Sequence, residues 1–117
     1  MPDNLPHVIS LSEAIDLTSR FRNDRTSNLP ICETFDLVSV NALIAVQNSA
    51  YLRIYLGEKE NGDICCILVA ADADGNDLLP SSFPSVSVLT DDGAIILEDA
   101  IRCPQVCPPD SPLNTNE

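Results

Sequence analysis

The chain contains five cysteines. Two of them, Cys103 and Cys107, are separated by three residues, a spacing at which their sulfur atoms could bind a metal or form a disulfide. Two thiolates could supply half of a tetrahedral zinc site. The other ligands would have to come from Cys32, Cys65, Cys66 or His7, and none of these forms a second C-x2-C pair. We therefore expect a tail disulfide or two free thiols at Cys103 and Cys107 rather than a metal, and we expect no cofactor.

The acidic segment from Asp72 to Asp77 begins like an EF-hand calcium loop. Such a loop needs a glycine at its sixth position and a bidentate glutamate at its twelfth. Here these positions hold Asp77 and Phe83. The segment is therefore interpreted as a polar turn after a strand, with calcium affinity no tighter than about millimolar.

Groups that could support catalysis are sparse. His7 is the single histidine and lies in a proline-flanked arm, so a nucleophile–base pair would have to use it. The glycine patterns of hydrolase elbows, P-loops and dinucleotide sites are absent. Glu58, Glu60 and Asp63 crowd one turn, where solvated carboxylates are expected. The sequence therefore predicts a protein that is not an enzyme.

The segment from Tyr51 to Tyr55 offers a different kind of site. Alternation along a strand places Tyr51, Arg53 and Tyr55 on one face. Leu52, Ile54 and Leu56 lie on the other face, which we expect to be the core side. Tyrosine and arginine are enriched at protein-interface hot spots, so Tyr51, Arg53 and Tyr55 are candidate partner-binding residues. The alternative is a cation–π stack on a solvated sheet face.

Charge narrows the classes of partner. Six Lys or Arg stand against eighteen Asp or Glu, which gives a net charge of −12. This balance argues against binding to nucleic acid or to an anionic membrane surface. It fits either a domain kept soluble by its charge or steering towards a basic protein.

The expected cellular compartment is inferred from targeting signals, membrane spans and the number of cysteines. The N-terminus has no signal-peptide pattern, and no apolar run approaches the ~20 residues of a membrane span. An odd number of cysteines fits a reducing environment better than a secreted disulfide framework. We therefore expect a cytoplasmic protein with no membrane partner.

Hydrophobic periodicity predicts the elements that position these residues. A capping-box pattern at Ser10–Glu13 opens a helix over about 11–22, and a second helix is expected over 35–45. Strands 50–56 and 63–71 should form a hairpin around Asn61-Gly62. Further strands are expected at 85–90 and 94–98.

Two helices followed along the chain by several strands predict an α+β fold. We expect two N-terminal helices packed on one face of a three- to four-stranded antiparallel meander, followed by an extended Pro/Cys-rich C-terminal tail. Residues 1–102 would form a single domain, and residues 103–117 would be a tail whose removal leaves the fold intact.

Several short motifs resemble those of an uncharacterised family of small acidic bacterial proteins. They are Arg53-Ile54-Tyr55, Asn61-Gly62, the Cys103–Cys107 run and Pro112-Leu113-Asn114. The resemblance covers residues 35–78 and 103–114. Gln105 departs from the second proline of the family's tail, and residues 80–94 are extra. The resemblance implies a helical N-terminal half and transfers no activity to any residue.

Together these features predict a non-catalytic, acidic protein-binding module. Its partner would be a protein, either basic or a second copy of the chain, and an immunity-like protein is one version. The alternative is a thiol-based metal-binding or redox protein that uses the C-terminal cysteine pair.

Overall fold

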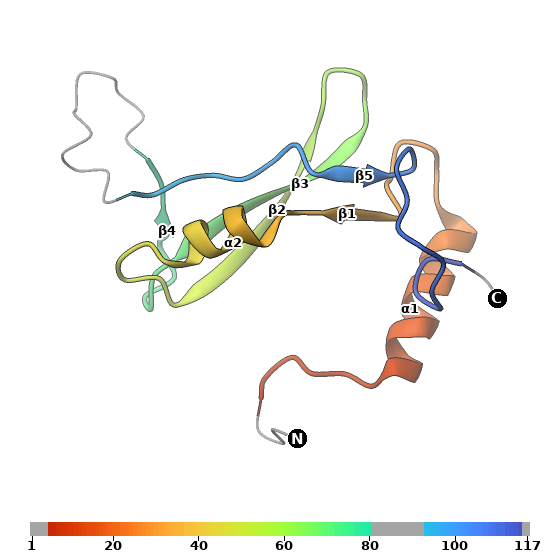
Figure 1. Ribbon diagram of the computed structural model, residues 1–117, viewed down its shortest axis with the longest axis horizontal. Coiled ribbons are helices and arrows are strands. Elements are labelled where there is room, and N and C mark those ends of the chain that lie inside the picture. The colour runs from red at the N-terminus through yellow and green to blue at the C-terminus, as the bar shows by residue number, and fades with distance from the viewer. Residues whose placement is uncertain (1–4, 81–92, 116–117) are drawn as a thin grey trace.

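The computed structural model describes residues 5–80 and 93–115. It contains two helices and antiparallel sheets, so the predicted α+β class is confirmed. Figure 1 shows a long central hairpin with one helix beside it and the other helix at the far end of the molecule. The strand expected at 85–90 lies outside the described residues.

Helix α1 (Leu11–Asp24) begins at the predicted capping box. The Ser10 hydroxyl accepts a hydrogen bond from the amide of Glu13 (3.0 Å), and the Glu13 carboxylate accepts one from the amide of Ser10 (3.4 Å). These two bonds satisfy amides that the first turn leaves without partners. No residue of α1 is buried, so its expected packing on the sheet is not confirmed.

The larger sheet has the order β2-β3-β4, and each neighbouring pair is antiparallel. Strands β2 (Tyr51–Glu58) and β3 (Ile64–Ala71) form the predicted hairpin. Its turn contains Gly62 at φ 94°, a conformation that glycine adopts without steric cost. Strand β4 (Asp77–Leu78) pairs with the end of β3.

A second, two-stranded sheet was not predicted. Strand β1 (Cys32–Thr34) pairs antiparallel with β5 (Ile101–Cys103). The strand expected at 94–98 is seen only as a single bridge between Leu97 and Leu68. The smaller sheet brings the segment before α2 next to residues 101–103 (Figure 1).

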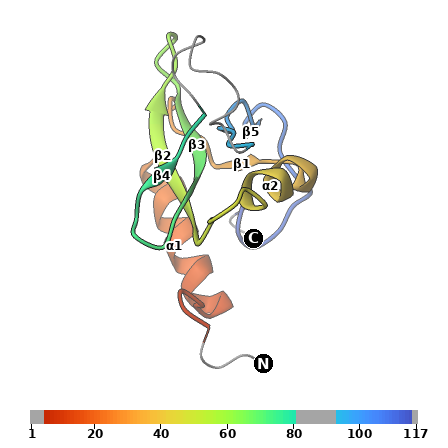
Figure 2. The same ribbon diagram turned by 90° about the vertical axis from the view of Figure 1, so that its left-hand side faces the viewer.

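The core lies between helix α2 (Leu37–Ile44) and the central strand β3, as Figure 2 shows from the side. Leu43 of α2 packs with Leu68 and Ala70, and Phe35 and Leu97 close the cluster. The helix matches the predicted segment 35–45. Strand β3 is buried on both faces from Leu68 to Ala71, which fits its uninterrupted apolar sequence.

The apolar side of β2 differs from the prediction. Leu52, Ile54 and Leu56 share a face with Leu68 and Ala70, but they remain 46%, 56% and 76% exposed. The eight-residue helix α2 contributes Leu43 to the core above β3 and leaves these three side chains of β2 uncovered. Expecting these residues on the core side was right about the face and wrong about their burial.

The C-terminal region is tied to the domain at two places. Cys103 is 2% exposed, lies at the end of β5 opposite Cys32, and forms a disulfide with Cys107. Further on, the guanidinium of Arg22 donates hydrogen bonds to the carbonyls of Leu113 (2.5 Å) and Thr115 (2.7 Å). Cys103 therefore belongs to a strand, although the predicted tail began with it.

Candidate functional site

The predicted partner-binding residues lie on the sheet face opposite α2. Tyr51, Arg53 and Tyr55 alternate along β2 with the residues that face the Leu43 cluster. Both tyrosines are exposed, and Arg53 is partly exposed. The structure thus brings the three predicted side chains together on one accessible strip, while their role in binding stays a prediction.

Asp77 holds two of these side chains in place. The Arg53 guanidinium donates to Oδ1 of Asp77 (2.5 Å) and to the carbonyl of Gly75 (3.0 Å). The Tyr55 hydroxyl donates to Oδ2 of the same carboxylate (2.6 Å). Asp77 belongs to β4, so these bonds cross over the central strand β3.

The electrostatics of this cluster favour the charged carboxylate. The hydrogen bond from Tyr55 lowers the pKa of the Asp77 carboxyl, and the bond and charge of Arg53 lower it further. The bond to Asp77 also raises the pKa of the Tyr55 hydroxyl, which therefore keeps its proton. The result is a fixed network of a cation, an anion and a neutral phenol on an open surface.

Sequence reasoning missed Asp77 as a member of this site. It assigned Asp77 to the calcium-like segment, because Asp72 and Asp74 precede it. The signal that could have found it is the short turn itself: a hairpin at Gly75 returns the chain beside β3 and places Asp77 opposite Ala71. Residues paired across strands share a face, so Asp77 lies on the face of Tyr51.

Two carboxylates of the calcium-like segment already accept hydrogen bonds from the protein itself. The Asp72 carboxylate accepts from the amides of Asp74 (3.0 Å) and Asn76 (2.9 Å), and the bond from Asn76 lowers the pKa of Asp72. Asp77 is engaged by Arg53 and Tyr55. Among the described residues, no group of three or more His, Cys, Asp or Glu could hold a metal ion.

The cysteines do not assemble a metal site either. Cys103 and Cys107 are joined in a disulfide, in which neither sulfur is a thiolate ligand. Cys32, Cys65 and Cys66 are free, and burial raises the pKa of the Cys65 and Cys66 thiols. Cys65 is buried and Cys66 is partly buried, and thiols with raised pKa values are poor nucleophiles.

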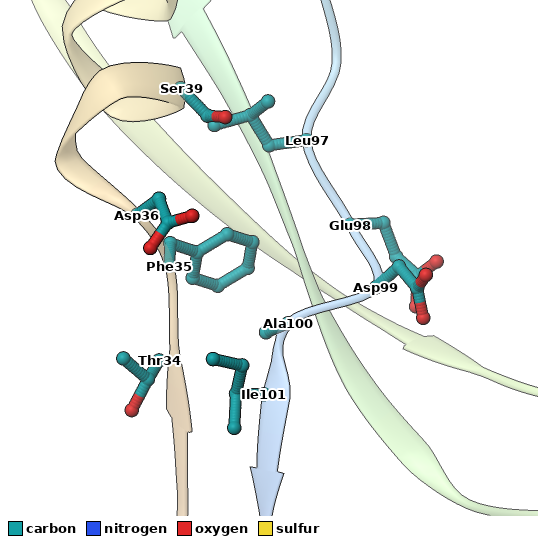
Figure 3. A pocket seen from close by; sticks show the side chains of 9 residues that line it. All are labelled: Thr34, Phe35, Asp36, Ser39, Leu97, Glu98, Asp99, Ala100 and Ile101. Atoms are coloured by element: carbon teal, nitrogen blue, oxygen red, sulfur yellow. The ribbon is translucent and has the colours of Figure 1, made fainter.

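A small cavity of about 150 Å³ lies between the start of α2 and the segment 97–101 (Figure 3). The ring of Phe35 points into it, while the side chains of Glu98 and Asp99 point away together on the far side of the backbone. Both carboxylates pair with Lys59, Glu98 at 3.1 Å and Asp99 at 3.8 Å. The cavity therefore has no converging catalytic groups and is smaller than typical ligand pockets.

A larger, open hollow of about 440 Å³ lies between the β2–β3 turn and residues 99–106. Its two cations, Lys59 and Arg102, are both engaged with carboxylates. His7, the candidate general base, is exposed in the N-terminal arm at φ 72°. These described residues do not bring a nucleophile and a base together.

Neither described helix is long and apolar enough to cross a membrane. In comparisons with known proteins, no protein-family model, curated protein sequence or solved structure matches this chain. The family resemblance based on the short motifs around Tyr55 and Cys103 thus stays a prediction, and the site must be interpreted from its own geometry.

Proposed function

We propose that this chain is a non-catalytic protein-binding module whose binding element is strand β2. The observation that carries the proposal is the network around Asp77, which fixes Arg53 and Tyr55 in one arrangement on an exposed face. Side chains already ordered in the free protein lose less conformational entropy on binding. Tyrosine and arginine anchors of this kind dominate the energy of many interfaces.

The charge of the chain supports a basic region on the partner. With a net charge of −12, the chain attracts cationic surfaces over a distance set by the salt concentration. An immunity-like protein that covers a cationic active site is one version of this function, and that version depends on charge alone. The proposal leads us to expect a partner that is retained at low salt and released as salt rises.

The test is capture from a lysate of the native cell on immobilised chain, read by quantitative mass spectrometry. Wild type, Tyr55→Ala and Val38→Ala are compared, because Val38 is an exposed apolar residue on α2, away from β2. A partner that wild type and Val38→Ala retain, and Tyr55→Ala loses, supports the proposal. If wild type, Tyr55→Ala and Val38→Ala all retain the partner equally, β2 is not the binding element.

A second candidate function, thiol exchange, is favoured by the disulfide between Cys103 and Cys107. In a reducing compartment a disulfide is usually transient and redox-active. Cys107 is exposed whereas Cys103 is buried, so an external thiolate would attack the Cys107 sulfur. The bond between the sulfurs would break, Cys103 would leave as a thiolate and take a proton, and Cys107 would remain in a mixed disulfide.

This second candidate has its own measurement. The purified protein is equilibrated in glutathione buffers of varied poise, quenched by alkylation and analysed by mass spectrometry, with Cys107→Ser as the control. Exchange predicts that Cys103 and Cys107 become alkylated together within the range of cytosolic poise. A pair that stays oxidised throughout that range would rule out this function.

A further inference from the structure

We propose that the chain forms a two-fold symmetric dimer in which strand β2 pairs antiparallel, edge to edge, with β2 of a second copy. This inference rests on the proposed function of β2 as a binding element and names one occupant for its free edge. It is carried by the strand order, the hydrogen-bond register and the side chains of Leu52, Ile54 and Leu56.

The register shows which backbone groups are free. The amide of Lys59 donates to the carbonyl of Asp63 (2.8 Å), so residues 57, 55, 53 and 51 point their backbone groups towards β3 by alternation. The N–H and C=O groups of Leu52, Ile54 and Leu56 then point away from β3. No segment in the described part of the chain pairs with that side of β2.

The free edge is also apolar. The three residues with outward backbone groups are the same three whose side chains remain exposed beside the core. Unprotected edges of this kind pair readily with another strand, and natural proteins usually block them with charges, prolines or bulges. Residues 50–57 contain no proline and one charge, Arg53, which is already paired with Asp77.

The edge is complementary to itself. An antiparallel pairing centred on Ile54 sets Ile54 opposite its own copy and Leu52 opposite Leu56 of the second copy. On the other face, Arg53 comes opposite Tyr55, a favourable cation–π pair. Glu58 comes opposite Ala50, so no like charges meet across the new ladder.

Charge also sets how the dimer responds to salt. Two chains of net charge −12 repel each other at long range, although the paired edges carry little charge themselves. Added salt screens that repulsion and leaves the apolar contacts in place. The dimer should therefore tighten as salt rises, whereas capture of a basic partner should weaken.

The experiment is sedimentation velocity of the purified chain from about 1 µM to about 1 mM, a range that covers weak to moderate affinities. Wild type should shift from monomer to dimer. In Leu52→Lys/Leu56→Lys, like charges meet in the proposed register, and dimerisation should weaken by at least about tenfold. In Leu52→Glu/Leu56→Lys, opposite charges meet, and the dimer should persist.

Leu37→Lys, at an exposed apolar position on α2, is the matched control and should dimerise like wild type. Circular dichroism checks that each variant is folded. A wild type that stays monomeric at every concentration overturns the dimer, as does equal dimerisation of the two double variants. If the chain stays monomeric but still captures a protein from the lysate through Tyr55, the dimer is overturned and the proposed function stands. If the chain dimerises and captures no such protein, the dimer is supported and the proposal of a different protein partner fails.

Discussion

The side chains of Glu33 and Arg102, which are paired across β1 and β5 in the smaller sheet, form an ion pair (3.1 Å), and both also bond to strand β3 of the larger sheet. Glu33 accepts a hydrogen bond from the amide of Cys66 (3.0 Å), and Arg102 donates one to the carbonyl of Ile64 (2.6 Å). Both of these backbone groups belong to β3 and lie on its side away from β2. Two side chains thus take the place of a missing strand at that edge.

We therefore expect Arg102→Met to destabilise the fold strongly. The side chains of Arg102 and Glu33 are only 17% and 5% exposed, so the pair is partly buried, and its loss together with the unpaired carbonyl of Ile64 should cost about 2 kcal/mol or more. The free energy of unfolding in urea measures the loss. Lys59→Met, which breaks an exposed pair with Glu98, is the control and should cost no more than about 1 kcal/mol.

Truncation should separate Cys103 from the segment that follows it. Deleting residues 103–117 removes a buried strand residue of β5, so the free energy of unfolding should fall by more than about 2 kcal/mol. Deleting residues 108–117 leaves β5 and the disulfide intact and should cost clearly less. Equal losses for the two deletions would show that the pairing of Cys103 with Cys32 contributes little.

Stability should depend on pH through Asp77. Its pKa is lowered in the fold, so its contribution is present above the ordinary aspartate pKa of about 3.9 and is lost as pH falls through the lowered value. Asp77→Asn should therefore flatten the acid side of the stability curve, measured by urea unfolding from about pH 6 to about pH 2. If the stability of Asp77→Asn falls with decreasing pH as steeply as that of wild type, the bonds from Arg53 and Tyr55 to Asp77 do not stabilise the fold.

Calcium should bind the segment from Asp72 to Asp77 no tighter than about millimolar, because the carboxylates of Asp72 and Asp77 already accept hydrogen bonds from the protein and the segment lacks key ligand positions. Titration calorimetry measures this directly. Micromolar affinity would contradict the interpretation of the segment as a plain turn.

Local signals predicted the local elements. The capping box at Ser10 and the hairpin at Asn61-Gly62 are both present, because each depends on residues only a few positions apart. Strands β1 and β5 were missed because each has three residues and finds its partner only after the chain has folded. The pair between Glu33 and Arg102, 69 positions apart, was missed for the same reason.

The candidate site was predicted in part. Alternation along β2 was enough to group Tyr51, Arg53 and Tyr55, and the same alternation grouped Leu52 with Ile54. Periodicity shows which residues share a face, but it does not show how far a neighbouring helix reaches. The exposure of Leu52 and the anchoring of Arg53 by Asp77 depend on packing that no local pattern encodes.

The most direct test of β2 as a binding element is the affinity of the captured partner for Tyr55→Ala, with Tyr55→Phe as the matched control. Removing the ring should weaken binding by about 1–3 kcal/mol and change the free energy of unfolding by less than about 1 kcal/mol, because Tyr55 is exposed. Tyr55→Phe keeps the ring and loses the bond to Asp77, so it should lie between wild type and Tyr55→Ala. An affinity for Tyr55→Ala equal to that of wild type would contradict the proposal.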